Sequence, residues 1–266
     1  MRRWIPFLKS DPVVAVIRLS GMIAAGNRAG ALNDQGMAAQ VERAFSRGKP
    51  AAVALVINSP GGSPAQSSLI AARIRRLAEE KDLKVYAFVE DLAASGGYWI
   101  ATAADEIWID QASVVGSIGV ISASFGFQDL IARYGVERRL YTSGKSKSFL
   151  DPFLPEKDED VARLKDIQSQ LHDSFIAQVR ARRGDRLADD AELFTGAFWI
   201  GQRAVDLGLA DGIGHVVPRM KEVFGDKTRF VAYGPRRSLF QRLGARIADD
   251  ALSVVEERGL YARFGL

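Results

Sequence analysis

The sequence predicts an α/β fold built on a parallel β-sheet. Three apolar runs, at residues 13–19, 51–57 and 84–89, have the continuous hydrophobicity of strands that are buried on both faces. Between the second and third runs, residues 64–81 carry leucine and isoleucine at helical spacing, and Pro64 suits the first turn of a helix. The order strand, helix, strand is typical of a βαβ unit, whose two strands are parallel.

The next elements follow from the placement of charged and apolar residues. No charged residue lies between Asp91 and Asp105, so the segment after the third strand predicts a buried helix, and residues 105–110 predict a further strand. The longest predicted helix covers residues 157–183, because apolar residues recur every three or four positions on one face. These apolar residues are Val161, Leu164, Ile167, Leu171, Phe175 and Val179.

Two further stretches are expected to form strands. Residues 136–141 look strand-like. The uncharged stretch between Gln111 and Asp129 contains serines and three glycines, so it is expected to be folded sheet and not a membrane span.

The chain is expected to form one large domain with an appendage. Residues 11–235 are assigned to the domain, and residues 1–10 to a basic N-terminal extension. Residues 236–266 are predicted to be an amphipathic helical segment, which packs either on a neighbour or on its own domain. Its apolar stripe consists of Leu239, Leu243, Ile247, Val254 and Val255.

Composition excludes several classes of protein. With 47% hydrophobic and 26% charged residues, the chain has the composition of an ordinary globular protein. The absence of cysteine excludes disulfides and thiolate metal sites, and the presence of only two histidines, His172 and His215, excludes a histidine-rich metal centre. No metal site built on thiolates or on several histidines is therefore expected.

Charge and hydropathy bear on partners and location. The net charge is +4, and no nucleic-acid-binding pattern accompanies it, so no nucleic-acid partner is expected. Residues 1–10 are basic, but no apolar core of signal-peptide length follows them. These features predict a cytoplasmic protein or one that contacts a membrane peripherally, with its basic ends near anionic lipid.

A glycine loop follows the second predicted strand. Asn58-Ser59-Pro60-Gly61-Gly62-Ser63 lies at the carboxyl end of that strand and opens the predicted helix, which is where open α/β sheets bind ligands. Glycines allow backbone N–H groups to approach a substrate closely, and such groups stabilise a developing oxyanion. Taken alone, the loop is more simply interpreted as a plain turn, because proline and glycine are common in loops of every kind.

A serine occupies the corresponding turn after the third strand. Ser95 is followed by Gly96 and Gly97, a pattern that partly matches the nucleophile elbow of hydrolases, with Ala93 where a glycine is usual. A helix N-cap is the alternative role of a serine at this place. Together with the glycine loop one βα unit earlier, Ser95 predicts a site for acyl transfer at neighbouring strand ends.

A serine hydroxyl needs a base within hydrogen-bond reach to become a nucleophile. His172 is predicted on the surface of a charged helix and His215 in a turn or helix start far along the chain, so neither is favoured. Lys145 and Lys147 lie in a segment rich in glycine and serine, and a lysine acts as a base only when its pKa falls from about 10.4 towards neutrality. Without further information, a flexible basic loop is the simpler interpretation of this segment.

Four motifs taken together resemble the signal peptide peptidase A family of Ser-Lys serine proteases. They are NSPGGS (58–63), ASGGYWIA (94–101), VVGSIGV (114–120) and TSGKSKSFLDPF (142–153). Their order and spacing match the family from about Val13 to Val217. The resemblance implies a Clp/crotonase-like fold of stacked β-β-α units, a peptide or protein substrate, and no cofactor.

The resemblance also implies roles for individual residues. By position, Ser95 matches the nucleophile of the family, and Lys147, 52 residues later, matches its general base. Lys145 does not align with the base. Ser117 matches a serine that orients the lysine, and Gly61 or Gly62, together with Gly96, would supply the oxyanion-hole N–H groups.

Family members often form bowl-shaped oligomers in which adjacent protomers contribute the serine and the lysine of one site. The resemblance therefore implies a homo-oligomer with active sites at protomer interfaces. Many relatives also carry a transmembrane anchor and cleave leftover signal peptides. No such span is visible in this sequence, so its substrates are expected among signal-peptide remnants or other small or unfolded polypeptides.

Three alternatives remain beside a Ser-Lys protease. A Clp-type Ser-His-Asp subunit is disfavoured, because no histidine lies between Ser95 and His172. A crotonase-like acyl-CoA enzyme of the same fold would use carboxylates, and Glu90 and Asp91 precede Ser95. The third alternative is a scaffold that keeps the fold without catalysis.

Overall fold

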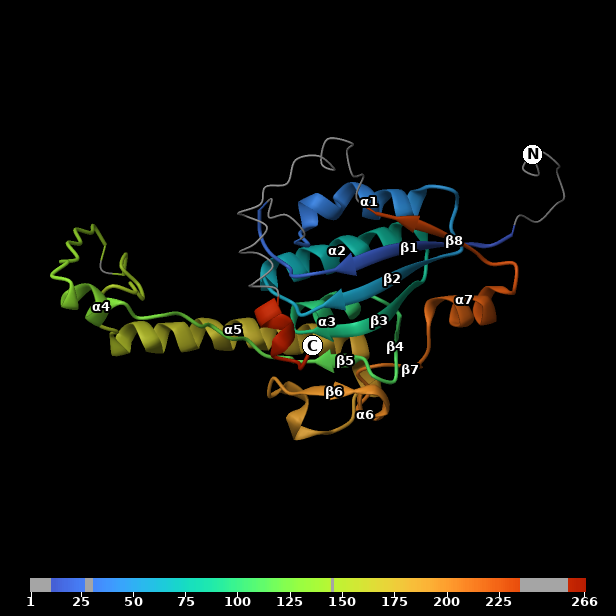
Figure 1. The fold of residues 1–266 in the computed structure, drawn as a ribbon. Helices are drawn as coiled ribbons and strands as arrows, with labels where there is room; N and C mark the ends of the chain where they lie inside the picture. Colours follow the sequence, from blue (N-terminus) through green and yellow to red (C-terminus); the bar gives the residue numbers. More distant parts are fainter. Residues whose placement is uncertain (1–10, 27–30, 145, 235–257) are drawn as a thin grey trace. The chain divides into compact units, whose positions relative to one another are not determined.

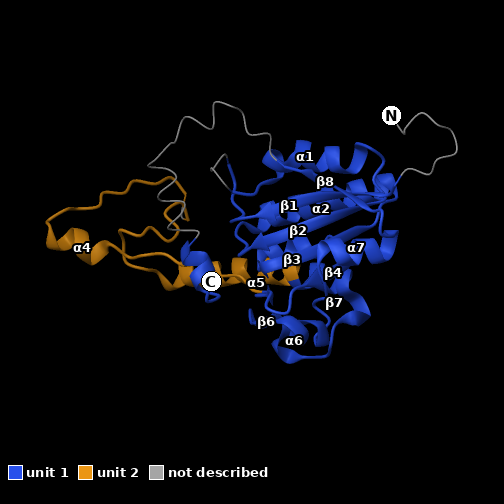
Figure 2. Ribbon diagram, turned by 45° about the vertical axis from the view of Figure 1, so that its right-hand side comes forward, with its two compact units in different colours: residues 1–118, 176–266 blue, residues 119–175 orange. Residues whose placement is uncertain are grey.

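The computed structural model describes residues 11–26, 31–144, 146–234 and 258–266. Figure 2 shows that the chain divides into two compact units. Unit 1 comprises residues 1–118 and 176–266, and unit 2 comprises residues 119–175. The predicted N-terminal extension, the C-terminal apolar stripe and Lys145 lie outside the described residues.

Unit 1 is built on an eight-stranded sheet whose path runs β6-β5-β3-β2-β1-β8 (Figure 1). The pairings along this path are parallel, except that β5 and β6 are antiparallel. Two short strands lie off the path, since β4 pairs with β3 and with β7. The strands are β1 (Val13–Ser20), β2 (Ala52–Ser59), β3 (Val85–Ala94), β4 (Glu106–Ile109), β5 (Val114–Gly116), β6 (Phe198–Ile200), β7 (Gly212–Ile213) and β8 (Arg229–Tyr233).

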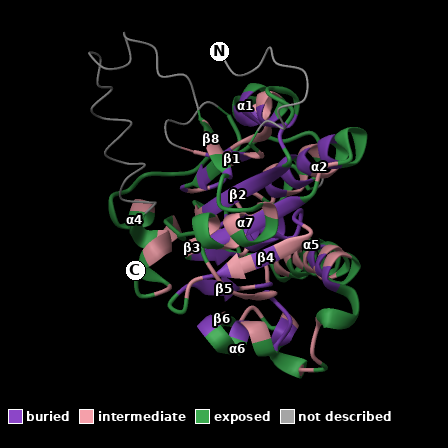
Figure 3. Cartoon of the chain, turned by 90° about the vertical axis from the view of Figure 1, so that its right-hand side faces the viewer, coloured by how far each residue is buried: buried purple, intermediate pink, exposed green. Residues whose placement is uncertain are grey.

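The first three strands and the helix between the second and third confirm the predicted βαβ wiring. Helix α1 (Asp34–Ser46) joins β1 to β2, and α2 (Pro64–Lys81) joins β2 to β3. Helix α2 begins at the predicted proline because the Ser63 side chain caps it, accepting a hydrogen bond from the Gln66 N–H. Strands β1 to β3 are buried along most of their length, as Figure 3 shows.

Helices cover both faces of the sheet. Helices α1 and α2 lie on one face, and α7 (Val216–Phe224) lies on the other (Figure 1). Met220 of α7 packs against Tyr86 and Phe88, which point to the same face of β3 because side chains of a strand alternate. Helix α6 (Gly201–Asp206) follows the edge strand β6.

Strand β3 continues five residues beyond its predicted end at residue 89. It pairs with β4 through Tyr86–Val89 and then with β5 through Leu92–Ala94. Its register against β2 shifts in the same region. The charged residues Glu90 and Asp91 ended the apolar run in the sequence, but they lie where the strand exchanges partners and their side chains reach solvent.

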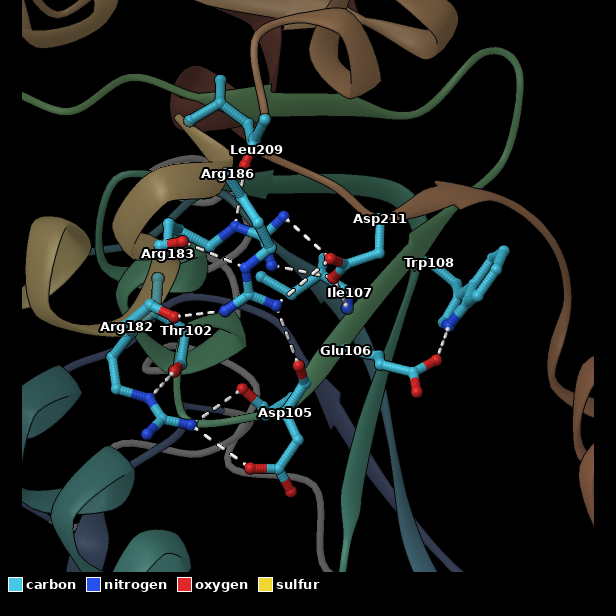
Figure 4. A network of polar contacts seen from close by, with 12 residues as sticks. Thr102, Asp105, Glu106, Ile107, Trp108, Arg182, Arg183, Arg186, Leu209 and Asp211 are labelled. Atoms are coloured by element: carbon cyan, nitrogen blue, oxygen red, sulfur yellow. Dashed lines mark hydrogen bonds and ion pairs between the residues drawn. The ribbon is translucent and has the colours of Figure 1, made fainter. Parts of the chain in front are cut away.

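The long helix α5 (Asp158–Arg183) confirms the prediction over residues 157–183 and belongs to both units. In unit 1, its last turns are held to the sheet by arginines (Figure 4). Arg183, whose side chain is only 2% exposed, pairs with Asp211 at 2.8 Å and donates to the Gly208 carbonyl at 2.7 Å. Arg182 donates to the Thr102 carbonyl at 2.8 Å, which connects α5 to the end of α3 (Gly96–Ala101).

One strand prediction was wrong and another is confirmed only in part. Residues 136–141 form no strand, and between Gln111 and Asp129 the only strand among the described residues is β5. Helix α4 (Gln128–Arg133) begins where the second stretch ends. The large apolar side chains at 121–127 and 136–141 are exposed in the described chain, so no sheet neighbour provides the hydrogen bonds that a strand needs there. Val114, Val115 and Ile118 are buried, and β5 pairs with β3 and β6.

The buried pair of Arg183 and Asp211 should dominate the stability of this part of unit 1. We expect Arg183→Met to lower the free energy of unfolding by about 3 kcal/mol, because it leaves the carboxylate without its buried partner. Arg203, whose side chain is 60% exposed and pairs with Asp190, is the matched control. Arg203→Met should cost less than about 1 kcal/mol. Equal losses in urea unfolding would contradict this assignment.

The same pair should make stability depend on pH. Burial raises the pKa of Asp211, but hydrogen bonds from Arg183 and from the Ile107 N–H outweigh it and hold the pKa below its ordinary value. A carboxyl whose pKa is lower in the folded state stabilises the fold above its unfolded pKa of about 4, and this stability is lost as the pH falls further. Urea unfolding between pH 7 and pH 3 should therefore show a smaller acid loss for Arg183→Met than for the wild type.

Candidate active site

Ser95 occupies a strained turn between β3 and α3. Its backbone angles are φ 52° and ψ −123°, in the region of positive φ that residues other than glycine rarely adopt. The Ser95 N–H donates to the Gly116 carbonyl at 2.9 Å, which holds this conformation. Such strain persists only where the surroundings enforce it, and it is concentrated at functional sites.

The side chain of Ser95 does not act as a helix cap. Ser95 is the residue that precedes α3, but its hydroxyl accepts no capping hydrogen bond from that helix within the described chain. The side chain is half-buried. The sequence left open a role as helix cap for Ser95, and its side chain does not adopt that role.

The glycine loop after β2 packs directly against this turn. A Cβ at Gly61 would lie 2.7 Å from the Gly96 nitrogen and 2.8 Å from the Ser95 Cβ. A Cβ at Gly97 would lie 2.5 Å from the Ser59 carbonyl oxygen, and one at Gly96 would overlap the Ser67 hydroxyl. These distances are shorter than van der Waals contact, so the two segments approach this closely only because the residues are glycines.

Two backbone N–H groups are available beside Ser95. Those of Gly62 and Gly96 have no hydrogen-bond partner in the part of the chain that the structure describes. The Gly62 nitrogen lies 3.4 Å from the position of a Cβ built on Gly96, so the two groups are neighbours. The Gly61 N–H instead donates to the Ser59 hydroxyl at 3.2 Å.

Sequence reasoning missed the residues that hold this loop in place. The buried Ser59 hydroxyl donates to the Gly21 carbonyl at 2.7 Å while it accepts from Gly61. The Ser67 hydroxyl donates to the Ser63 carbonyl at 2.9 Å inside α2. The only available signal was their position, one at the end of a strand and one in the first turn of a helix.

Tyr98 connects α3 to the segment around Leu209. Its ring is fully buried, and its hydroxyl donates to the Leu209 carbonyl at 2.9 Å. Burial raises the pKa of Tyr98 well above its ordinary value, so the phenol remains a neutral donor.

Ser117 lies beside Ser95 because of the strand register. Ala94 of β3 pairs with Gly116 of β5, and the two serines follow these residues at the same edge of the sheet. Ser117 is half-buried, has φ 51°, and donates its N–H to the Ala197 carbonyl at 2.7 Å. The structure therefore brings together Ser95, Ser117 and the predicted glycines.

Lys147 belongs to the other unit. It lies in a turn of unit 2, where its N–H donates to the Gly144 carbonyl at 3.2 Å and its side chain is exposed. Ser95 belongs to unit 1, so neither unit contains both predicted members of the dyad.

The two histidines have other neighbours. His215 precedes α7, and its Nε2 lies 2.8 Å from Asp110 Oδ2, at the end of β4. The Ala112 N–H and then His215 hold the pKa of Asp110 below its ordinary value. His172 is half-buried on the part of α5 that belongs to unit 2.

Glu90 and Asp91, the carboxylates that an acyl-CoA enzyme would use, each have a polar partner in the structure. Glu90 pairs with Arg18 at 2.6 Å, and Asp91 accepts a hydrogen bond from Asn58 Nδ2 at 2.5 Å. Both line a cavity of about 810 Å³. Among the described residues, no group of three or more acidic or histidine side chains could hold a metal ion, and no helix is long and apolar enough to cross a membrane.

Solved structures of low sequence identity share the fold. An alanine variant of the 1510-N membrane-bound stomatin-specific protease matches with a TM-score of 0.51 and 14% identity, over 85% of this chain and all of that one. A second alanine variant, in complex with a substrate peptide, matches with a TM-score of 0.52 and 12% identity, over 93% of this chain and 99% of that one. The fold is thus the predicted Clp/crotonase-like α/β fold.

Several sequence relatives are longer than this chain. A Brucella melitensis protein named as a Na(+)/H(+) antiporter is 45% identical over the whole of this chain, which spans 39% of that protein. A putative signal peptide peptidase of Enterococcus faecium is 29% identical over 78% of this chain and 64% of its own length. A putative protease of Synechocystis sp. is 30% identical over 76% of this chain and 69% of its own length.

The comparison with protein families agrees with the geometry around Ser95. Residues 77–223, which include the serine turn, β5 and unit 2, match peptidase family S49. This match covers more than half of the chain. The strained serine, the glycine loop and the sequence relatives therefore lead to one conclusion: the chain belongs to peptidase family S49.

Proposed function

We propose that this chain is a serine endopeptidase in which Ser95 is the nucleophile and Lys147 the general base. The observation that carries the proposal is the turn at Ser95, which is strained, half-buried and free of a capping role within the described chain. Membership of a peptidase family supports the reaction class. It argues against an acyl-CoA enzyme or a scaffold without catalysis.

The proposed oxyanion hole is formed by the glycine loop and the start of α3. Gly96 contributes its N–H from one side, and the loop contributes that of Gly61 or Gly62 from the other. In this structure the Gly62 N–H has no partner among the described residues, whereas Gly61 donates to Ser59, which favours Gly62. Each N–H aimed at the oxyanion is worth about 3 kcal/mol of transition-state stabilisation.

The proposed base reaches Ser95 when unit 2 docks onto a serine-bearing unit. Lys147 is exposed in the described chain, whereas a lysine that acts as a general base has to be neutral. Docking would desolvate the ammonium and lower its pKa, and Ser117, at the same sheet edge as Ser95, would orient it.

A second copy of the chain is the proposed docking partner. Most of the large exposed apolar side chains of the described residues belong to unit 2, and a monomer would leave them in water. We propose a homo-oligomer in which unit 2 of one protomer completes the site of its neighbour. The exposed apolar residues of unit 2 are Ile121, Phe125, Phe127, Leu130, Tyr134, Val136, Leu140, Tyr141, Phe153, Ile167 and Leu171.

The proposed reaction proceeds through an acyl-enzyme. Neutral Lys147 Nζ takes the proton of Ser95 Oγ as this oxygen attacks the carbonyl carbon of the scissile peptide bond. The C–N bond then breaks, the lysine returns the proton to the leaving amine, and the acyl group remains on Ser95. Lysine next activates a water molecule, which hydrolyses the ester and restores the serine.

The substrates are proposed to be signal-peptide remnants or other small or unfolded polypeptides. The relative in Enterococcus faecium, named as a putative signal peptide peptidase, favours the first group. For the location, the Brucella relative named as an antiporter favours contact with a membrane over a purely cytoplasmic placement, because such a transporter works in a membrane. No nucleic-acid partner is proposed.

Cleavage of a diverse peptide mixture, followed by mass spectrometry, tests the dyad. We expect the wild type to cleave, and Ser95→Ala and Lys147→Ala to lose at least about 10⁴-fold in rate, because each removes one half of the reacting pair. Lys145→Ala is the matched control, two residues from the proposed base, and should keep its activity. Loss of activity in Lys145→Ala with a fully active Lys147→Ala would overturn the assignment of the base.

The histidines should be dispensable for cleavage. The double variant His172→Ala/His215→Ala is expected to keep its rate within about threefold, because His215 contacts Asp110 and the proposed general base is Lys147 and not a histidine. Circular dichroism would establish that the variant is folded. An inactive but folded double variant would restore a Ser-His-Asp mechanism to consideration.

Mixing two inactive variants tests whether protomers share a site. Coexpressed Ser95→Ala and Lys147→Ala chains should regain activity at about one quarter of the sites, since random neighbours then pair an intact serine with an intact lysine. The variants expressed separately are the controls, and light scattering gives the size of each oligomer. An active wild-type monomer, or mixed oligomers without activity, would refute the shared site.

A further inference from the structure

The C-terminal residues 258–266 contact the strands that lead to the proposed active site. Residues 258–262 are helical, and the segment belongs to unit 1. Residues 235–257 separate this segment in the sequence from β8, the last strand. The segment nevertheless packs on β3 and β5, which are far from β8 in the strand order (Figure 1).

Two aromatic side chains make this contact. Tyr261 and Phe264 pack against a buried cluster formed by Leu92, Ala94 and Val114. Ala94 is the residue immediately before Ser95, and Leu92 to Ala94 is the part of β3 that pairs with β5. The two aromatic side chains therefore pack on the C-terminal end of β3. They lie on the same face of the sheet as α7, which packs on the N-terminal half of this strand.

Further contacts connect the same two residues to the neighbouring strands. The Tyr261 hydroxyl donates to the Asn58 carbonyl at 2.9 Å, at the point where β2 passes into the glycine loop. The ring of Phe264 meets that of Phe198 edge to face, with centroids 5.2 Å apart, and Phe198 pairs with Gly116, the residue before Ser117. One short segment thus touches the strands that carry the glycine loop, Ser95 and Ser117.

The cover that α7 gives to this face does not extend to the strand ends. Helix α7 packs on Tyr86 and Phe88, and the cavity of about 810 Å³ opens next to it at Glu90 and Asp91, with Leu266 in its wall. Beyond this cavity, among the described residues, Tyr261 and Phe264 are the partly buried apolar side chains that pack on Leu92, Ala94 and Val114.

We infer that Tyr261 and Phe264 are positioning residues of the peptidase site. By their contacts they fix the positions of the carboxyl ends of β2, β3 and β5 relative to one another, and hence the positions of the glycine loop, Ser95 and Ser117. This inference rests on the proposed function for its kinetic part. The mechanism is geometric, because an error of about 1 Å in the placement of a nucleophile can cost 10²-fold in rate. Neither residue takes part in the chemistry.

Hydrogen exchange measured by mass spectrometry on the full chain tests the positioning without any need for activity. In Phe264→Ala, amides in peptides that cover residues 92–97 and 114–118 should exchange at least about tenfold faster, since the Ser95 N–H bond to Gly116 loses its support. Peptides from α1 and β8 should be unchanged. Ala262→Ser, an exposed position in the same helix, is the matched control. Wild-type exchange at residues 92–97 in folded Phe264→Ala would overturn the inference.

Kinetics on the same variants give the functional readout. The rate of Ser95 labelling by a fluorophosphonate, and kcat for a cleaved peptide, should fall about tenfold in Phe264→Ala with KM within about twofold, and Phe264→Leu should recover most of the loss.

Tyr261→Phe is a second test of the inference, which remains available if Phe264→Ala fails to fold. This change removes only the hydroxyl that donates to the Asn58 carbonyl, and a fall of about threefold in both rates is expected. A change in KM alone, or wild-type rates in Phe264→Ala and Tyr261→Phe together with wild-type exchange, would overturn the inference. A wild-type chain that neither labels nor cleaves would instead refute the proposed function, and the exchange data would still decide the positioning.

Discussion

The close approach of the glycine loop to the serine turn is the constraint on which the site depends. Gly61, Gly96 and Gly97 each lie where a Cβ would collide with the backbone or side chain of the opposing segment. Ser95 itself has a Cβ, and it is held at positive φ by one hydrogen bond to Gly116. The loop and the turn therefore come within contact distance only if β2, β3 and β5 keep their register, since a slip of one residue would move every one of these atoms.

That register depends on the change of partner along β3. The strand pairs first with β4 and then with β5, and the exposed Glu90 and Asp91 mark the point of change. Because of this change Ala94 lies opposite Gly116, and the two serines that follow meet at one sheet edge. Arg182 of α5 is hydrogen-bonded to the end of α3, and the aromatic residues of the C-terminus pack on the ends of β3 and β5.

The proposed dyad divides into a rigid part and a part that has to be assembled. Ser95 and the oxyanion donors belong to the sheet unit, whereas Lys147 belongs to a unit whose large apolar side chains are mostly exposed. A lysine in water is protonated and cannot act as a base. In the proposed enzyme, the burial that oligomerisation provides would supply both the position and the pKa of the lysine, so that an isolated protomer would be inactive.

The sequence by itself determined the order of strands and helices in the first half of the chain, because continuous apolar runs and a capped helix are local patterns. The spacing of four motifs was likewise sufficient for the family and the fold. The strand expected at 136–141 was wrong, and between Gln111 and Asp129 only residues 114–116 form a strand in the described chain. The apolar residues at 121–127 and 136–141 face solvent and have no sheet neighbour. Only the tertiary structure decided that Ser95 is not a helix cap, that Ser117 stands beside it, and that Tyr261 and Phe264 support the strand ends. These facts depend on strand register and on contacts between residues far apart in the chain, and neither is encoded in a local pattern.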